Sequence, residues 1–161
     1  MTLRALGYDV LATDSPVAFS LLEKNIEKNQ YGTSRLEAQI LDWHSDPSSW
    51  PWSSPAEDAS ASLQPSFDLI VTTDTVYIEA LFDPLLKTIK ALSLGEKSPA
   101  ILLALEERDA QSIEEFWRRS ERHGFKRKEI KTARLAKAVK QYLNWKRDDW
   151  EGVRVYELTV K

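Results

Sequence analysis

The sequence predicts an α/β fold, in which buried strands alternate with amphipathic helices. Short apolar runs recur along the chain, and most precede a segment with apolar residues at helical spacing. Several of these runs end in an acidic residue or a polar cluster. With 161 residues, 42% of them hydrophobic, the chain can form one domain (residues 1–161) with a core of its own.

The composition excludes several classes of function. The chain has no cysteine, so it can form no disulfide and no thiolate site, and its two histidines, His44 and His123, lie far apart without metal-ligand spacing. We therefore expect no metal site. The sequence has no apolar run long enough to span a membrane and no signal peptide, so we expect a cytoplasmic protein, with the nucleus as a second location.

The first strand is predicted at Tyr8–Thr13, after a helical turn that ends at Gly7. It runs into Asp14. A carboxylate at such a strand end can accept hydrogen bonds from ribose hydroxyls, which makes Asp14 a candidate for nucleotide binding. The alternative is that Asp14 helps to cap the next helix, for which Ser15 is the predicted N-cap and which extends from Pro16 to about Asn29.

The second strand is predicted at Leu36–Leu41, where apolar and polar residues alternate. It is followed by Asp42 and Trp43. Asp42 could accept a hydrogen bond from an exocyclic adenine amine, and Trp43 could stack on a purine. Alternatively, Trp43 only covers the end of the sheet.

Residues 45–66 are rich in serine and proline and have no periodicity, so they predict a low-complexity surface loop. We expect Trp50 and Trp52 to attach this loop to the rest of the domain.

The third strand, Phe67–Val71, is predicted to be buried on both faces, and a helix is predicted over Ala80–Leu92. The polar turn between them contains Asp74 and Tyr77. Because ligands of open α/β sheets bind at the carboxyl ends of strands, both residues are candidates for a site. The alternative is that Asp74 caps the following helix and Tyr77 packs beneath it.

The C-terminal part predicts three strands and two helices. The strands are Ala100–Leu105, Phe125–Ile130 and Val153–Val160, and the helices are Gln111–His123 and Ala133–Trp145. Within this part, residues 118–147 contain 12 Lys or Arg against two Glu, although the whole chain has a net charge of −3. The basic segment Arg118–Arg147 is a candidate contact for an acidic protein or RNA, and its alternative is a solvated surface.

In this order and spacing, these segments resemble the Rossmann-like, seven-strand class I S-adenosylmethionine-dependent methyltransferases. More narrowly, five motifs resemble family 16, which includes many protein-lysine methyltransferases. The motifs are ATD at Ala12–Asp14 with LLEKNIEKN at Leu21–Asn29, LDW at Leu41–Trp43, DTVY at Asp74–Tyr77, DPLLKTI at Asp83–Ile89 and EER at Glu106–Arg108.

The resemblance implies S-adenosyl-L-methionine as cofactor and a lysine of a protein as methyl acceptor, with the translation machinery as one candidate source. It implies that Asp14 holds the cofactor ribose and that Asp42 and Trp43 surround the adenine. Asp74 and Tyr77 would line the acceptor channel as the catalytic pair.

The family's glycine-rich loop and the strand before it are absent from this sequence. In the family's sheet that strand lies between the strands that end here at Asp14 and Val71, so its absence leaves two unpaired edges. Three explanations stay open: an incomplete product, a strand supplied by a partner, or a chain that has lost methyl transfer and keeps a binding role through Arg118–Arg147.

Overall fold

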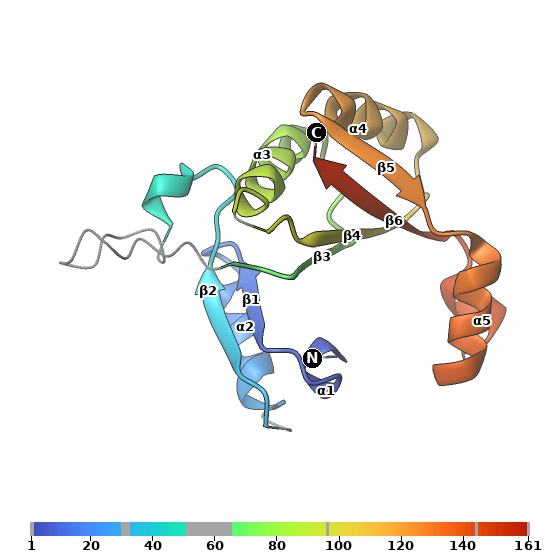
Figure 1. Cartoon of the computed structure of the whole chain (residues 1–161), viewed down its shortest axis with the longest axis horizontal. Coiled ribbons are helices and arrows are strands. Elements are labelled where there is room, and N and C mark those ends of the chain that lie inside the picture. Colours follow the sequence, from blue (N-terminus) through green and yellow to red (C-terminus); the bar gives the residue numbers. More distant parts are fainter. Residues whose placement is uncertain (1, 30–32, 51–65, 96, 144, 161) are drawn as a thin grey trace. The chain divides into compact units, whose positions relative to one another are not determined.

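The computed structural model describes residues 2–29, 33–50, 66–95, 97–143 and 145–160. The chain separates into two compact units, unit 1 (Met1–Gln64) and unit 2 (Pro65–Lys161), and each is described by itself. Figure 1 shows the elements of both units.

Unit 1 contains a parallel two-stranded sheet. Its elements are α1 (Thr2–Ala5), β1 (Val10–Asp14), α2 (Phe19–Glu27), β2 (Leu36–Ile40) and the 3-10 helix η1 (Pro47–Ser49). The register pairs Val10 with Leu36 and Asp14 with Ile40. The predicted strand–helix–strand order is therefore present.

A small set of contacts holds unit 1 together. Its buried apolar side chains in the described ranges are Ile26, Leu41 and Trp50. Arg4 of α1 is also buried, and it donates from Nε to the Ser34 carbonyl (2.7 Å) and from Nη1 to the Asn29 carbonyl (3.0 Å). One arginine thus ties α1 to both ends of the connection between α2 and β2.

Unit 2 contains a mixed four-stranded sheet. Its elements are β3 (Leu69–Thr73), the 3-10 helix η2 (Glu79–Leu81), α3 (Phe82–Leu92), β4 (Ala100–Glu106), α4 (Ala110–Arg122), β5 (Phe125–Glu129), α5 (Thr132–Tyr142), the 3-10 helix η3 (Arg147–Trp150) and β6 (Val153–Val160). The strand order is β3-β4-β6-β5. β3 and β4 are parallel, and the other two pairs are antiparallel.

The core of unit 2 lies on one face of this sheet. Ile101, Leu103 and Leu105 are buried at alternating positions of β4, as the two-residue period of a strand requires. Tyr156 and Leu158 of β6, which are also buried, lie opposite Leu103 and Ile101.

A chain of aromatic rings connects the helices to this face. Phe82 of α3 meets Phe116 of α4 edge to face, with ring centroids 5.2 Å apart. Next along α4, Trp117 contacts Tyr156 of β6 in the same way at 4.6 Å, and the Arg127 guanidinium lies 4.5 Å from the centroid of the Trp117 ring. These contacts pack α3 against α4 and α4 against the sheet.

Most predicted elements agree with the structure. The prediction that a glycine ends each of two helices is also confirmed. Gly7 and Gly124 follow α1 and α4 with φ of 89° and 88°, a backbone conformation that favours glycine. The predicted strands at 100–105, 125–130 and 153–160 correspond to β4, β5 and β6 within one residue at each end.

The predicted start of the second helix is wrong. α2 begins at Phe19 rather than Pro16, and its N-cap is Ala18, without a side-chain hydrogen bond. The Ser15 carbonyl instead accepts from the Ala18 amide (3.1 Å) and closes a turn over the intervening residues. Ser15 therefore begins a turn that precedes the helix, and does not cap the helix.

The prediction for the third strand is wrong in two respects. β3 is shifted two residues toward the C-terminus, because backbone pairing with Leu103 and Ala104 continues through Thr72 and Thr73. Nor is the strand buried on both faces, since Val71 is 42% exposed. In the described ranges β1 pairs with β2 alone, and β3 pairs with β4 alone.

The predicted surface loop 45–66 is described only at its two ends. Of the predicted loop 45–66, residues 51–65, including Trp52, lie outside the described residues. Before them, Asp46 caps η1 and Trp50 is buried.

The predicted helix 133–145 is observed as α5, none of whose residues is buried. No helix in the described ranges is long and apolar enough to cross a membrane.

Candidate functional site

In unit 1, two of the predicted carboxylates lie at the same edge of the sheet. β1 and β2 are parallel, so their carboxyl ends meet there. Asp14 is the last residue of β1, and its carbonyl accepts from the Leu41 amide (2.9 Å) directly before Asp42. The strand pairing thus brings Asp14 and Asp42 together, with the partly buried Trp43 next in the chain.

Each of these carboxylates uses one oxygen within its own loop. Asp14 Oδ1 accepts from the Ser15 amide (2.8 Å), and Asp42 Oδ1 accepts from the His44 amide (2.9 Å). In the part of the chain that the structure describes, no protein donor contacts either Oδ2. Since a carboxylate has acceptor capacity at both oxygens, Asp14 can still accept from a ribose hydroxyl, and Asp42 from an amine. These residues fit an adenosine-containing cofactor.

In unit 2, Asp74 follows β3 in an unusual backbone conformation. Its φ is 52°, and no other non-glycine residue in the described ranges has a positive φ. The Asp74 amide donates to the Ala104 carbonyl of β4 (3.0 Å), and the flanking hydroxyls of Thr72 and Thr75 are hydrogen-bonded to each other at 2.7 Å. Such local strain is maintained only where the surrounding structure enforces it, and it is frequent at functional sites.

Neither structural alternative for Asp74 and Tyr77 agrees with the structure. The N-caps of η2 and α3 are Ile78 and Leu81, and neither makes a side-chain capping bond. Tyr77 is 64% exposed, so it does not pack beneath the helix. It lines an open hollow of about 640 Å³ together with Glu79 and residues of α4.

A cation also lies within electrostatic range of Asp74. Arg108 forms an ion pair with Glu106 at the end of β4, with a nitrogen–oxygen distance of 2.6 Å. The hydrogen bond and charge of Glu106 raise the pKa of Arg108, and the charge of Asp74 raises this pKa further. The EER sequence at 106–108 thus places an arginine near the candidate catalytic carboxylate.

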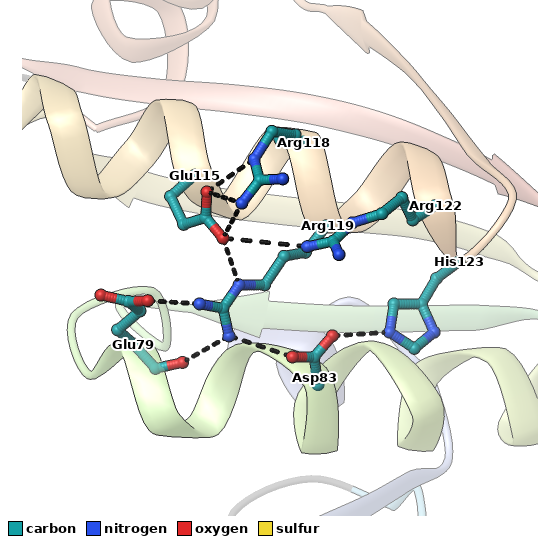
Figure 2. A network of polar contacts seen from close by, with 7 residues as sticks. All are labelled: Glu79, Asp83, Glu115, Arg118, Arg119, Arg122 and His123. Atoms are coloured by element: carbon teal, nitrogen blue, oxygen red, sulfur yellow. Dashed lines mark hydrogen bonds and ion pairs between the residues drawn. The ribbon is translucent and has the colours of Figure 1, made fainter.

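A network of charged residues lies beside the same hollow (Figure 2). The Arg119 guanidinium donates to Glu115 (2.6 Å), to Asp83 (3.0 Å) and to a carboxylate oxygen of Glu79. Asp83 is in turn 2.8 Å from His123 Nε2. The hydrogen bond to His123 holds the pKa of Asp83 below its ordinary value, and the hydrogen bond from Arg119 makes a smaller contribution in the same direction.

This network was not predicted from the sequence. The spacing of Glu115 and Arg119, four residues apart on one helix, could have indicated their pairing. No local pattern indicates that Arg119 also reaches Glu79 and Asp83, which lie 40 and 36 residues away in the chain.

The predicted site residues therefore form two groups. Asp14, Asp42 and Trp43 belong to unit 1, whereas Asp74 and Tyr77 belong to unit 2. Among the described residues, no group of three or more histidine, aspartate or glutamate side chains could hold a metal ion.

Comparison with known families gives a match that covers most of the chain. A family model described as lysine methyltransferase matches residues 1–123. The matched range includes both groups of candidate residues and ends after α4.

Proposed function

This chain belongs to the lysine methyltransferase family, and we propose that it takes part in methyl transfer from S-adenosyl-L-methionine to a lysine of a protein. The observation that carries this proposal is the pair of carboxylates, Asp14 and Asp42, at the joint carboxyl edge of two parallel strands. This is the position at which open α/β sheets bind nucleotides. The translation machinery is one proposed source of the acceptor, and the cytoplasm or the nucleus is the proposed location.

The residues of unit 1 would hold the cofactor. Asp14 Oδ2 would accept from a ribose hydroxyl and Asp42 Oδ2 from the adenine amine, while the indole of Trp43 would pack on the purine. When bound, S-adenosylmethionine supplies an electrophilic methyl group. The protein's own task is then to position an uncharged amine and to exclude water from it.

Asp74 and Tyr77 would prepare the acceptor. A lysine amine, with an ordinary pKa of about 10.4, must lose a proton before it can act as a nucleophile. The Asp74 carboxylate can accept that proton through a hydrogen bond, and the exposed Tyr77 hydroxyl can orient the amine.

We also propose that the complete sheet of this fold has seven strands. The six strands of the described residues have the pairings β1-β2 and β3-β4-β6-β5, so that β1 and β3 each have a single neighbour there. One additional strand paired with both would complete the sheet. A strand of this kind could come from a further segment or from a partner chain.

Calorimetric titration with S-adenosylmethionine tests the cofactor role. We expect micromolar binding by the 161-residue chain, lost in Asp14→Ala and retained in Glu23→Ala, which removes an exposed carboxylate of α2 from the same unit. Equal affinity of Asp14→Ala and the unmodified chain would refute the role of Asp14. A folded chain that binds no S-adenosylmethionine would refute the function for this chain alone.

The catalytic role needs a transfer assay. Incubation with a protein extract and methyl-labelled S-adenosylmethionine, followed by acid hydrolysis, should yield labelled methyl-lysine. Asp74→Asn and Tyr77→Phe should both reduce this product while the fold is retained. Label found only in small molecules would indicate a different acceptor class.

A second candidate function is non-catalytic binding of an acidic protein or RNA through the basic region. Arg118, Arg119 and Arg122 form ion pairs with Glu115, and the other basic residues of this region lie on β5, on α5 and in the segments that adjoin α5. On α5, Arg134, Lys137 and Lys140 have no ion pair with any described residue, and the exposed Tyr142 and Trp145 follow them. Binding of single-stranded RNA or polyglutamate by a chain that does not bind S-adenosylmethionine would favour this function, and Lys137→Glu should weaken it.

A further inference from the structure

Arg119 connects the segment that carries Tyr77 to helix α4. The guanidinium contacts two groups of Glu79, namely its side chain and its carbonyl oxygen, the latter at 3.4 Å from Nη1. Glu79 lies only two residues after Tyr77. Figure 2 shows Arg119 reaching from α4 toward η2 and the first turn of α3.

The same arginine spans the hollow beside Tyr77. Tyr77 and Glu79 line one side of this hollow, and α4 residues including Ser112 and Glu115 line the other. Arg119 itself is a lining residue and bonds to both sides, through Glu79 and Glu115. The position of the Tyr77 segment relative to α4 therefore depends on Arg119.

Few other polar contacts hold this segment. Upstream of Tyr77, the Asp74 amide is bonded to β4. Downstream, the hydrogen bonds of η2 are local, from the Leu81 amide to Ile78 and from the Phe82 amide to Glu79. In the described part of the chain, Arg119 gives the only hydrogen bonds from α4 to η2.

The geometry of this contact requires an arginine. Its side chain is only 17% exposed, and its Nε and both Nη atoms bond to three different carboxylates, those of Glu79, Asp83 and Glu115. An ammonium group is a point charge and cannot reproduce this planar fork. Without the guanidinium, the three carboxylates would repel one another, and the segment would move away from α4.

We propose that Arg119 is a positioning residue, which holds the Tyr77 segment against α4 and so sets the width of the hollow where the methyl acceptor enters. The assignment to the acceptor rests on the proposed function. The link from Arg119 to the segment rests on the hydrogen bonds alone.

Hydrogen exchange tests this link without an activity assay. In Arg119→Gln, the Leu81 and Phe82 amides should exchange about tenfold faster or more, because local opening of η2 becomes easier. Arg118→Gln is the matched control, since Arg118 bonds to Glu115 but not to η2, and it should leave both amides unchanged. Arg119→Lys should fail to restore the slow exchange.

A second variant tests the same contact in case Arg119→Gln does not fold. Glu79→Gln alters only the η2 end of the contact, at a side chain that is 64% exposed, and it should accelerate the same two amides. Unchanged exchange of these amides in both Glu79→Gln and a folded Arg119→Gln would overturn the proposal.

The transfer assay tests the link to the acceptor. We expect Arg119→Gln and Arg119→Lys to lower methyl-lysine formation at least tenfold at saturating S-adenosylmethionine, with the dissociation constant of the cofactor unchanged. Arg122→Gln, at a residue that pairs with Glu115 but does not line the hollow, should retain full transfer. Full transfer by Arg119→Lys would refute the positioning role. Absence of cofactor binding and transfer in the unmodified chain would instead refute the proposed function, and the exchange result would still decide the role of Arg119 in holding η2.

Discussion

The two units differ strongly in how much core they have. Unit 1 contains three of the seventeen buried apolar side chains in the described ranges, whereas unit 2 contains the other fourteen. The sheet of unit 1 has two strands, and a two-stranded sheet is marginally stable by itself. In unit 2, two helices pack on a sheet of four strands. The proposed cofactor residues thus lie in the weaker unit, and the proposed acceptor residues lie in the stronger one.

The largest expected effect comes from the core of unit 2. Phe116→Ala should reduce the stability of this unit by about 3–5 kcal/mol, because Phe116 is fully buried and contacts Phe82 and Trp117. The loss can be measured from the urea dependence of hydrogen exchange at the amides of β4 and β6. Phe116→Leu, which keeps most of the apolar volume, is the control. A loss below about 1 kcal/mol for Phe116→Ala would contradict the assignment of this core.

A smaller effect should appear in unit 1 when cofactor binds. At a concentration 100 times its dissociation constant, S-adenosylmethionine should raise the free energy of opening of β1 and β2 by about 2.7 kcal/mol. Hydrogen exchange of their amides measures this gain. It should vanish in Asp14→Ala and persist in Glu23→Ala. The same gain in Asp14→Ala would show that Asp14 does not hold the cofactor.

The next effect concerns the backbone strain at Asp74. Asp74→Gly should stabilise unit 2 by up to about 1 kcal/mol, because glycine adopts a φ of 52° without steric cost. It should also abolish methyl transfer. Asp74→Asn should leave stability nearly unchanged and lose transfer too. These outcomes would indicate that the stronger unit retains strain for function, whereas a destabilised Asp74→Gly protein would contradict this.

The smallest effect should appear in acid. The hydrogen bonds from His123 and Arg119 lower the pKa of Asp83 in the folded protein below its ordinary value of 3.8. A lowered pKa stabilises the folded state above the ordinary value, and this contribution is lost as the pH falls through the lowered one. The stability of unit 2 should therefore decrease from pH 5 to pH 3 more steeply in the unmodified chain than in Asp83→Asn. Equal slopes in urea unfolding would contradict this role of Asp83.

The sequence predicted the elements of unit 2 well, where the helix and strand periods are strong. α4 differs from its predicted range by one residue at each end, because Ile113, Phe116 and Trp117 follow the helical period and Gly124 ends it. The predictions failed where backbone hydrogen bonds determine the outcome. The extension of β3 through Thr73 and the turn before α2 both follow from such bonds, which side-chain patterns do not encode.

The candidate site could be predicted only in part. Local order along the chain indicated Asp14, Asp42, Asp74 and Tyr77, since each follows a predicted strand. The contacts of Arg119 with Glu79 and Asp83 could not be predicted, because they depend on how α3 packs against α4, and that packing joins residues up to 40 positions apart.

The contact between Trp117 and Tyr156 has an optical consequence. With ring centroids 4.6 Å apart, energy absorbed by the tyrosine passes to the indole before the tyrosine can emit. Tyr156 should therefore emit little in the folded protein, and its emission should rise when unit 2 unfolds and the two rings move far apart. The loss of this ring contact thus adds tyrosine emission to the optical signal of unfolding, without an attached dye.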